Sequence, residues 1–122
     1  MLKVYVYQKC ARCRQALNWL DAAGLRYHAF PIRTAPPSVE ELRRMCAFLE
    51  GRLSALLNTS GQDYRALNFK AIWPLLSETA LFERLTENGN LIKRPFLIDQ
   101  DFGLVGFKQV EWQDTCMQHG RL

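Results

Sequence analysis

The chain has 122 residues, of which 48% are apolar and 23% are charged. These are ordinary values for a single soluble globular domain that can bury a core. Its 16 basic and 12 acidic residues leave a formal charge of +4, and no block of like charges occurs. This excess suits an anionic substrate or an acidic protein surface, and it gives no reason to expect direct binding of nucleic acid.

No apolar run approaches the roughly 18 residues that a membrane span requires, so no membrane segment is expected. The stretch "MLKVYVYQ" at the N-terminus alternates apolar and polar residues and lacks the apolar core and cleavage site of a signal peptide. We therefore predict a cytoplasmic protein. Because thiols are kept reduced in that compartment, the 4 cysteines are not expected to form a structural disulfide framework.

The first part of the chain predicts a strand, a helix and a second strand. Residues 3–7, "KVYVY", alternate with period two and are rich in β-branched and aromatic residues, which is typical of a strand. From Ala11 onward apolar residues recur at helical spacing, and Gly24 stands where a helix commonly ends. Residues 25–32, "LRYHAFPI", have the composition of a second strand.

The middle of the chain is predicted to be helical. Ser38 and Glu41 have the spacing of a capping box ahead of a helix over about residues 39–50. Polar residues punctuate the helical pattern of residues 52–90, where Ser77 is positioned to begin another helix.

Two short strands, residues 95–99 and 103–107, and a helix over 108–118 complete the pattern. The order β-α-β, helices, β-β-α predicts an α/β protein with a thioredoxin-like fold. Its mixed four-stranded sheet would carry helices on both faces, with a helical insertion over about residues 38–90 in the middle of the chain. No repeat or linker divides the sequence, so residues 1–122 are expected to form a single domain.

The most informative local motif is the C-x-x-C pair of Cys10 and Cys13, at the junction of the first strand and the first helix. At a helix N-terminus, free N–H groups and the helix dipole favour the thiolate form of Cys10, and Lys9, Arg12 and Arg14 add positive charge. Cys13 comes round to the same face of the helix and could attack a mixed disulfide formed at Cys10. The pair therefore favours redox chemistry.

Two other interpretations of the pair stay open. A structural zinc site would need two more ligands, but the remaining candidates are isolated in the sequence: His28, Cys46, Cys116 and His119. No metal site is therefore predicted. The pair could also be two cysteines on a helix without chemistry. Of the other thiols, Cys46 is expected in the core. Cys116, near the C-terminus, is expected to be incidental, although an exposed thiol there could be glutathionylated.

A second informative stretch, "NLIKRPFLID", covers residues 90–99. In a thioredoxin-like fold the loop before the third strand faces the redox cysteine, and a proline there is commonly cis. Pro95 would then present the backbone of Arg94 to an incoming sulfur. The Arg94 guanidinium could hold an anion or stabilise the Cys10 thiolate. The alternative is an ordinary turn with a surface arginine.

Four segments together closely resemble the arsenate reductase-related family of thioredoxin-like proteins, which includes the Spx/MgsR regulators. These segments are "YQKCARCRQALNWL", "LLNTSGQDYRALN", "LIKRPFLID" and "LVGFKQVEW". The resemblance covers essentially the whole chain, in order and at similar spacing. It implies a reactive cysteine after the first strand and an Arg-Pro pair before the third.

The resemblance implies two functions besides general thiol–disulfide exchange. Glutathione-linked arsenate reductases have one catalytic cysteine, matched by Cys10, and three arginines around the oxyanion. Only Arg94 matches one of the three, since Asn58 and Phe107 stand at the other two positions. Spx-like regulators use a C-x-x-C switch and bind the C-terminal domain of the RNA polymerase α subunit. Gly51 falls roughly where that partner contact would lie, but a glycine there is also a plain helix terminator, which is the favoured interpretation.

The sequence thus predicts a thiol–disulfide oxidoreductase with Cys10 as nucleophile, Cys13 as resolving thiol and Arg94 as the third catalytic residue. Pro95, Arg12 and Ser60 are the predicted substrate-binding residues, although the "NTSG" stretch around Ser60 could simply cap a helix. The expected substrate is a thiol, a disulfide or a small oxyanion. No bound cofactor is expected, and glutathione or thioredoxin would donate electrons. The alternatives are an Spx-like sensor that binds RNA polymerase and, with less support, an arsenate reductase.

Overall fold

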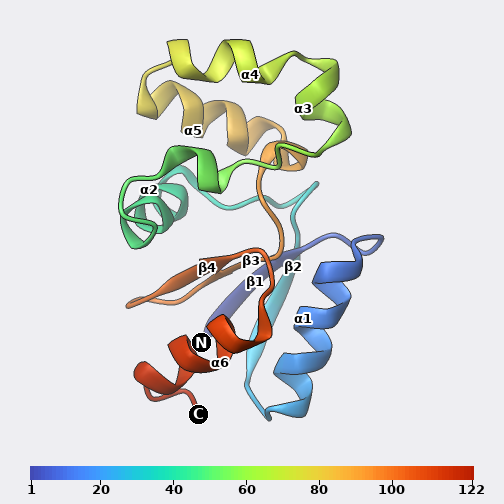
Figure 1. Ribbon diagram of the computed structural model, residues 1–122, viewed down its shortest axis with the longest axis vertical. Coiled ribbons are helices and arrows are strands. Elements are labelled where there is room, and N and C mark those ends of the chain that lie inside the picture. The colour runs from blue at the N-terminus through green and yellow to red at the C-terminus, as the bar shows by residue number, and fades with distance from the viewer.

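The computed structural model describes all residues from 1 to 122 and centres on a four-stranded sheet (Figure 1). The strands are β1 (Leu2–Val6), β2 (Tyr27–Pro31), β3 (Phe96–Ile98) and β4 (Gly103–Val105), in the spatial order β2-β1-β3-β4. β1 pairs with β2 in parallel and with β3 antiparallel, and β3 and β4 form an antiparallel hairpin. The predicted mixed sheet is confirmed.

Helices cover both faces of this sheet. The longer helices are α1 (Ala11–Ala22), α2 (Val39–Phe48), α5 (Glu78–Glu87) and α6 (Gln109–Gln118). Two short helices, α3 (Gln62–Ala66) and α4 (Phe69–Ile72), and three 3-10 turns, η1 (Leu53–Leu56), η2 (Trp73–Leu75) and η3 (Gly89–Leu91), complete the insertion between β2 and β3. In Figure 1, α1 and α6 lie on one side of the sheet and the insertion lies on the other. This arrangement is the thioredoxin-like fold with a helical insertion that the sequence predicted.

Side chains of alternate strand residues point into two separate cores. Leu2, Val4 and Leu97 pack with α1 and α6, where Trp112 is fully buried. Tyr5 points to the opposite face and joins the larger core of the insertion. This division follows from the period of two along a strand.

The helix starts follow the capping signals in the sequence. Ser38 and Glu41 form the predicted capping box, and Ser77 caps α5 through a hydrogen bond from the Ala80 N–H. Gly24 follows α1 at φ +71°, a conformation that glycine adopts without steric cost. The stretch 52–90, predicted only as helical, is divided into short segments: Pro74 lies just after α4, and polar residues separate other segments.

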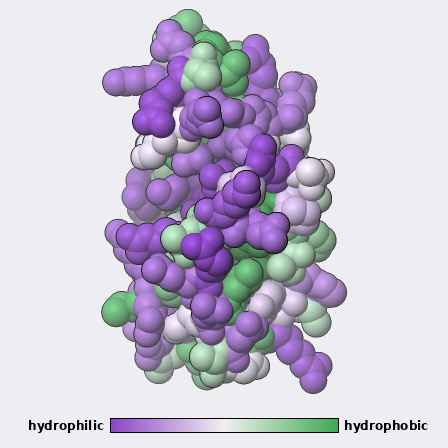
Figure 2. Space-filling view, turned by 90° about the vertical axis from the view of Figure 1, so that its right-hand side faces the viewer, coloured by the Kyte–Doolittle hydropathy of each residue, from purple (hydrophilic) through white to green (hydrophobic).

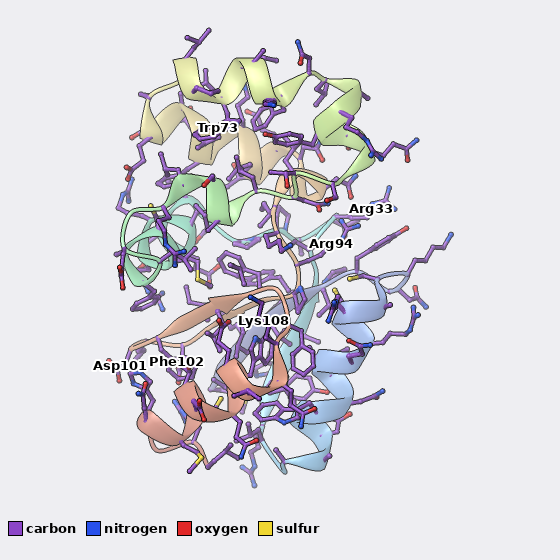
Figure 3. The ribbon with its side chains drawn as sticks, viewed as in Figure 1. Arg33, Trp73, Arg94, Asp101, Phe102 and Lys108 are labelled. Atoms are coloured by element: carbon purple, nitrogen blue, oxygen red, sulfur yellow. The ribbon has the colours of Figure 1, made fainter.

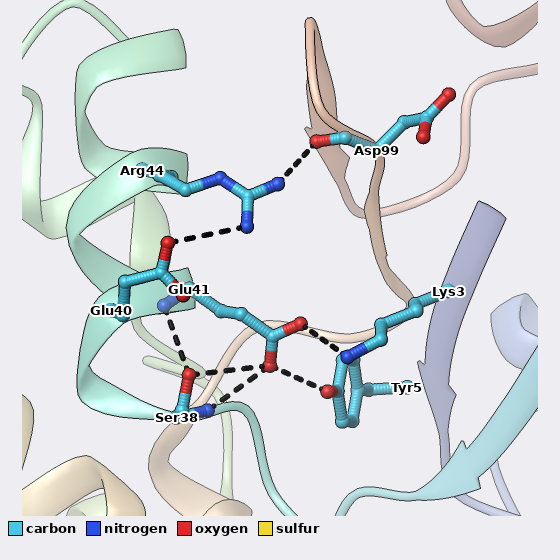
Figure 4. Close-up of polar contacts among 7 residues, drawn as sticks. All are labelled: Lys3, Tyr5, Ser38, Glu40, Glu41, Arg44 and Asp99. Atoms are coloured by element: carbon cyan, nitrogen blue, oxygen red, sulfur yellow. Dashed lines mark hydrogen bonds and ion pairs between the residues drawn. The ribbon is translucent and has the colours of Figure 1, made fainter. Parts of the chain in front are cut away.

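A buried carboxylate links the sheet to α2 (Figure 4). Glu41, which is only 6% exposed, accepts hydrogen bonds from the Tyr5 hydroxyl at 2.6 Å, from Lys3 Nζ at 3.1 Å and from the Ser38 N–H at 3.2 Å. Burial alone would raise the pKa of Glu41, but these donors outweigh it and lower the pKa below its ordinary value.

None of the helices is both long and apolar enough to pass through a bilayer.

Candidate active site

Cys10 occupies the N-cap of α1, as the sequence predicted. Its backbone is extended, at φ −96° and ψ 116°, and its sulfur accepts a hydrogen bond from the Cys13 N–H at 3.3 Å. Cys10 is half-buried, so it retains partial access to solvent, although it lines neither of the two cavities described below. The site therefore begins with an accessible sulfur that accepts a backbone N–H bond of the first helical turn.

Cys13 differs from Cys10 in its surroundings. It is 1% exposed, and its sulfur accepts a hydrogen bond from the Tyr7 N–H at 3.5 Å. Burial, followed by the hydrogen bond with Cys10 and the negative charge on Cys10, raises the pKa of Cys13 to about 12. The Tyr7 N–H and the charge of Arg94 oppose this rise. Cys13 is consequently a protonated thiol near neutral pH.

The loop before β3 lies beside the cysteine pair for a topological reason. Because β1 and β3 are antiparallel, with Tyr5 opposite Phe96, the chain that enters β3 passes the chain that leaves β1. This places Arg94 over Tyr7, with the guanidinium carbon 4.8 Å from the ring centre. The Arg94–Pro95 peptide bond is cis, as expected.

The predicted substrate-binding residues fall in different places. Arg12 is exposed on the first turn of α1 and, together with Arg94, lines a groove of about 920 Å³. Pro95 directly precedes β3. Ser60 is exposed in the turn ahead of α3 and lines neither this groove nor the smaller cavity beside Tyr7.

The groove runs past the sheet edge formed by β4 and is rich in basic side chains. In Figure 3, Arg94 and Lys108 lie near the middle of the molecule, between the insertion and α6. The other basic residues that line the groove are Arg12, Arg52, Lys93 and His119. Three carboxylates, Glu50, Asp101 and Glu111, also line it. A ligand with negative charge fits this balance.

The two remaining cysteines lie in the cores. Cys46 is 5% exposed, as expected of a small core residue, and Cys116 is fully buried. The suggestion of an exposed Cys116 was therefore wrong, because α6 packs this side chain against the sheet. Burial raises the pKa of both thiols, which makes them poor nucleophiles. No group of three or more histidine, cysteine or acidic side chains lies together in a way that could hold a metal ion.

Sequence reasoning missed Arg33, which follows β2. Its guanidinium carbon lies 4.9 Å from the centre of the Tyr7 ring, and Nη1 donates a hydrogen bond of 2.9 Å to the Tyr7 hydroxyl. β1 and β2 are parallel, so the residues after both strands meet at one edge of the sheet. This rule for parallel strands, applied to the predicted β-α-β unit, could have indicated from the sequence that Arg33 lies near Tyr7.

Comparison with known proteins identifies the family. A model of the ArsC family matches residues 5–115. The chain belongs to the ArsC family. It is 38% identical to the uncharacterized protein YusI of Bacillus subtilis over 114 residues, covering 93% of this chain and 97% of that protein. A global transcriptional regulator Spx of Streptococcus agalactiae is 27% identical over 111 residues, covering 91% and 80% of the two chains.

Among solved structures, a crystal structure described as a possible arsenate reductase from Streptococcus mutans is similar throughout. The TM-score is 0.84 at 35% identity, with 93% of this chain and 98% of that chain covered. The thioredoxin-like fold and the family resemblance predicted from the sequence are thereby confirmed.

In this ArsC-family chain, the positions assigned to the second and third family arginines have different roles. Asn58 donates a hydrogen bond from its side chain to the Asn90 carbonyl at 3.1 Å and lines the cavity beside Tyr7. Phe107 is 9% exposed and packs edge-on against Trp112, with ring centres 5.1 Å apart. Tyr64, in α3, is buried, and its hydroxyl accepts a hydrogen bond from Trp73 Nε1 at 3.3 Å.

Proposed function

We propose that this ArsC-family chain is a thiol–disulfide oxidoreductase in which Cys10 is the nucleophile and Cys13 the resolving thiol. The observation that carries the proposal is the asymmetry of the pair. Cys10 is partly accessible at the N-cap of α1, whereas Cys13 is buried three residues on, with its N–H directed at the Cys10 sulfur. One accessible sulfur and one enclosed sulfur are what a two-step exchange requires.

In the first step the Cys10 thiolate attacks one sulfur of a substrate disulfide RS–SR′. A Cys10–S–S–R mixed disulfide forms, and R′S⁻ leaves and takes a proton from solvent. Cys13 then loses its proton and attacks the Cys10 sulfur, which forms the Cys10–Cys13 disulfide and releases RS⁻. Two electrons pass from the protein thiols to the substrate.

The electrostatics of Cys13 suit this order. Part of the rise in the pKa of Cys13 comes from its hydrogen bond with Cys10 and from the charge on Cys10. A mixed disulfide at Cys10 carries no such charge, so Cys13 loses its proton more readily after the first step than before it. Arg94 has the opposite influence and favours the Cys13 thiolate.

Reduced thioredoxin, or two molecules of glutathione, would return the disulfide to the dithiol by the same exchange in reverse. A cytoplasmic setting, which we also propose, would keep the pair in its reduced form. Arg12, Pro95 and Ser60 remain the proposed substrate contacts. Arg12 and Arg94 line the groove through which a substrate would approach.

Mass spectrometry after mild hydrogen peroxide treatment tests the proposal. We expect a Cys10–Cys13 disulfide that dithiothreitol reopens, and a stable mixed disulfide at Cys10 when Cys13→Ser is treated with a small disulfide. Formation of no such bridge, together with no mixed disulfide in the variant, would refute the proposal.

A second candidate function is supported by the relatives named global transcriptional regulator Spx, at 27% identity. In that case the cysteine pair would act as a switch that controls binding to the C-terminal domain of the RNA polymerase α subunit. A pull-down with that domain, using reduced and oxidised protein, decides between the oxidoreductase and the regulator. Binding in neither state excludes the regulator.

Arsenate reduction with glutathione has less support. The structure that is similar at a TM-score of 0.84 is described as a possible arsenate reductase, but Asn58 and Phe107 replace two expected arginines. Losing two charge-assisted contacts to the oxyanion would cost several kcal/mol, of order 1.5–3 for each. A glutathione-coupled assay without arsenate turnover would exclude this activity.

A further inference from the structure

A second cavity, of about 130 Å³, is lined by Tyr7, whose N–H binds the Cys13 sulfur, and by Arg94, which also lines the larger groove. The side chains that line it include Tyr7, Arg33, Arg94, Asn58, Asn90 and Asp63. Figure 3 shows Arg33 toward the right-hand side of the molecule and Arg94 inward of it, on separate loops. Figure 2 views the molecule from that side, and the face is predominantly hydrophilic. The cavity is therefore polar and too small for more than one functional group of a ligand.

Two guanidinium groups meet at this cavity. The guanidinium carbons of Arg33 and Arg94 lie 4.9 and 4.8 Å from the centre of the same Tyr7 ring. Arg33 follows β2 and Arg94 precedes β3, so the strands on both sides of β1 deliver them to one place. Two planar guanidinium groups, each with several N–H donors, are suited to bind a planar or tetrahedral anion at one small cavity.

The protein leaves these donors incompletely used. Arg94 Nη1 is buried and has no hydrogen-bond partner in the protein, and neither arginine is ion-paired with a carboxylate. A buried donor without a partner costs free energy, and in native proteins it commonly meets a ligand or solvent. An anion in the cavity would supply the missing acceptor.

The one carboxylate that lines the cavity is already occupied by other donors. Asp63 Oδ2 accepts hydrogen bonds from the side-chain amides of Asn88 at 3.1 Å and Asn90 at 3.0 Å. These two bonds are the main reason why the pKa of Asp63 is lowered, and the charges of Arg33 and Arg94 contribute less. Two positive groups thus face one negative group, which leaves the cavity with an excess of positive charge.

We propose that this cavity is a subsite for a carboxylate of the substrate, held between Arg33 and Arg94. The inference rests on the proposed function and gives its substrate class: small disulfides and thiols that carry a carboxylate close to the sulfur. The subsite and the cysteine pair share two residues. Tyr7 donates its N–H to Cys13 and packs under both arginines, while Arg94 acts on the Cys13 thiol and lines the groove as well.

The first experiment compares two small disulfides, the anionic dithiodiglycolate and the neutral hydroxyethyl disulfide. Each is mixed in single turnover with pre-reduced protein, and each reaction converts the disulfide into two thiols while the protein pair is oxidised. We expect the ratio of the anionic to the neutral rate to fall about tenfold in Arg33→Gln, the effect of losing one charge-assisted contact. Arg33→Lys should recover part of the ratio.

Arg26→Gln is the matched control. Arg26 is exposed at the other end of β2 from Arg33, so the variant removes the same charge without touching the cavity. Its ratio should equal that of the wild-type protein. If Arg33→Gln slows the reaction of both disulfides equally, Arg33 only supports Tyr7. If neither rate changes, Arg33 takes no part in the reaction. Either result refutes the subsite.

A second measurement separates the subsite from the catalytic proposal. The second probe is the redox-inert carboxylate (methylthio)acetate, CH3–S–CH2–COO⁻. Its binding to the wild-type protein, Arg33→Gln and Arg26→Gln is followed by NMR titration. Saturable binding that weakens about tenfold only in Arg33→Gln supports the subsite, even if the protein reduces no disulfide. Disulfide reduction without any difference between the variants leaves the oxidoreductase standing and refutes the subsite.

Discussion

The Cys13 N–H points at the Cys10 sulfur across 3.3 Å, yet only Cys10 reaches the surface. The two sulfurs share one helix start and differ in exposure because Cys10 is the cap and Cys13 lies one turn inside the helix, facing the sheet. The hydrogen bond that caps the helix therefore also orients the more accessible sulfur. This asymmetry has consequences for reactivity and for stability.

We expect the four thiols to react with iodoacetamide in a defined order. Cys10 should be modified first at pH 7.5, and at least about tenfold faster than Cys13, because a buried thiol with a raised pKa is a poor nucleophile. Cys46 and Cys116 should be as slow as Cys13, since burial raises their pKa as well. Peptide mass spectrometry of timed samples measures the order. As a control, the four thiols should react with iodoacetamide at equal rates in about 8 M urea, where the protein is unfolded. Modification of Cys13 ahead of Cys10 in the folded protein would contradict the assignment of roles.

Cys13 should also make the stability of the protein depend on alkaline pH. Its pKa rises from 9.0 in the unfolded chain to about 12 in the folded protein, so folding favours the neutral thiol. That contribution is complete below pH 9 and is lost as the pH rises toward 12. At pH 10 the free energy of unfolding should have lost about 1 kcal/mol from this group.

The comparison with Cys13→Ala isolates this effect. The difference in unfolding free energy between wild type and variant, from urea titrations with a reductant present, should be smaller at pH 10 than at pH 7.5. An equal difference at the two pH values would show that the Cys13 thiol does not titrate as stated.

The sequence was sufficient for features whose signals are local. The alternation of residues 3–7, the Ser38–Glu41 capping box and the strand-to-helix junction at Cys10 each depend on neighbours in the chain, and the structure has all three. Arg94 could be related to the cysteines only by assuming the fold, and the antiparallel pairing of β1 with β3 supplies that relation.

Residues that enter a site by tertiary proximity alone escaped prediction. Arg33 lies in a loop without periodicity, and only the parallel pairing of β1 and β2 brings it to Tyr7. Ser60 shows the opposite case, in which a residue is close in sequence to a cavity residue but lies away from the cavity. It is two residues from Asn58, which does line the small cavity, but the turn directs Ser60 to solvent. Nearness to Asn58 in the sequence therefore does not bring Ser60 to the wall of either cavity, because a turn reverses direction within two residues.

The buried carboxylate of Glu41 should stabilise the fold in a pH-dependent way. Glu41→Gln keeps the shape but loses the charge that Tyr5 and Lys3 bind, at a cost of about 1–3 kcal/mol in unfolding free energy at pH 7. Because the folded pKa is lowered, the wild-type advantage is present above pH 4.5 and is lost as the pH falls through the folded pKa. Urea titrations at pH 7 and at acidic pH measure both effects.

Glu40→Gln is the control for this experiment. Glu40 is 70% exposed in its side chain and pairs with Arg44 at 3.6 Å on the same helix, an arrangement that contributes at most about 0.5 kcal/mol. An equal loss in Glu40→Gln and Glu41→Gln would mean that the buried hydrogen bonds contribute nothing beyond surface charge.

Gly89 should be the glycine least tolerant of substitution, because η3 packs directly against the chain that follows β2. A Cβ at position 89 would lie 1.8 Å from the Ile32 carbonyl oxygen and 3.3 Å from Arg33 Cα. Gly89→Ala must push that loop away, so we expect a loss of about 3 kcal/mol in unfolding free energy, together with displacement of Arg33 from Tyr7. Gly24→Ala, where a Cβ meets no atom within 4 Å but φ is +71°, should cost only about 1 kcal/mol. Urea unfolding of both variants measures this difference. The anionic-to-neutral rate ratio then reports whether Arg33 has moved, and an undiminished ratio in a destabilised Gly89→Ala protein would show that the loop relaxes without carrying Arg33 with it.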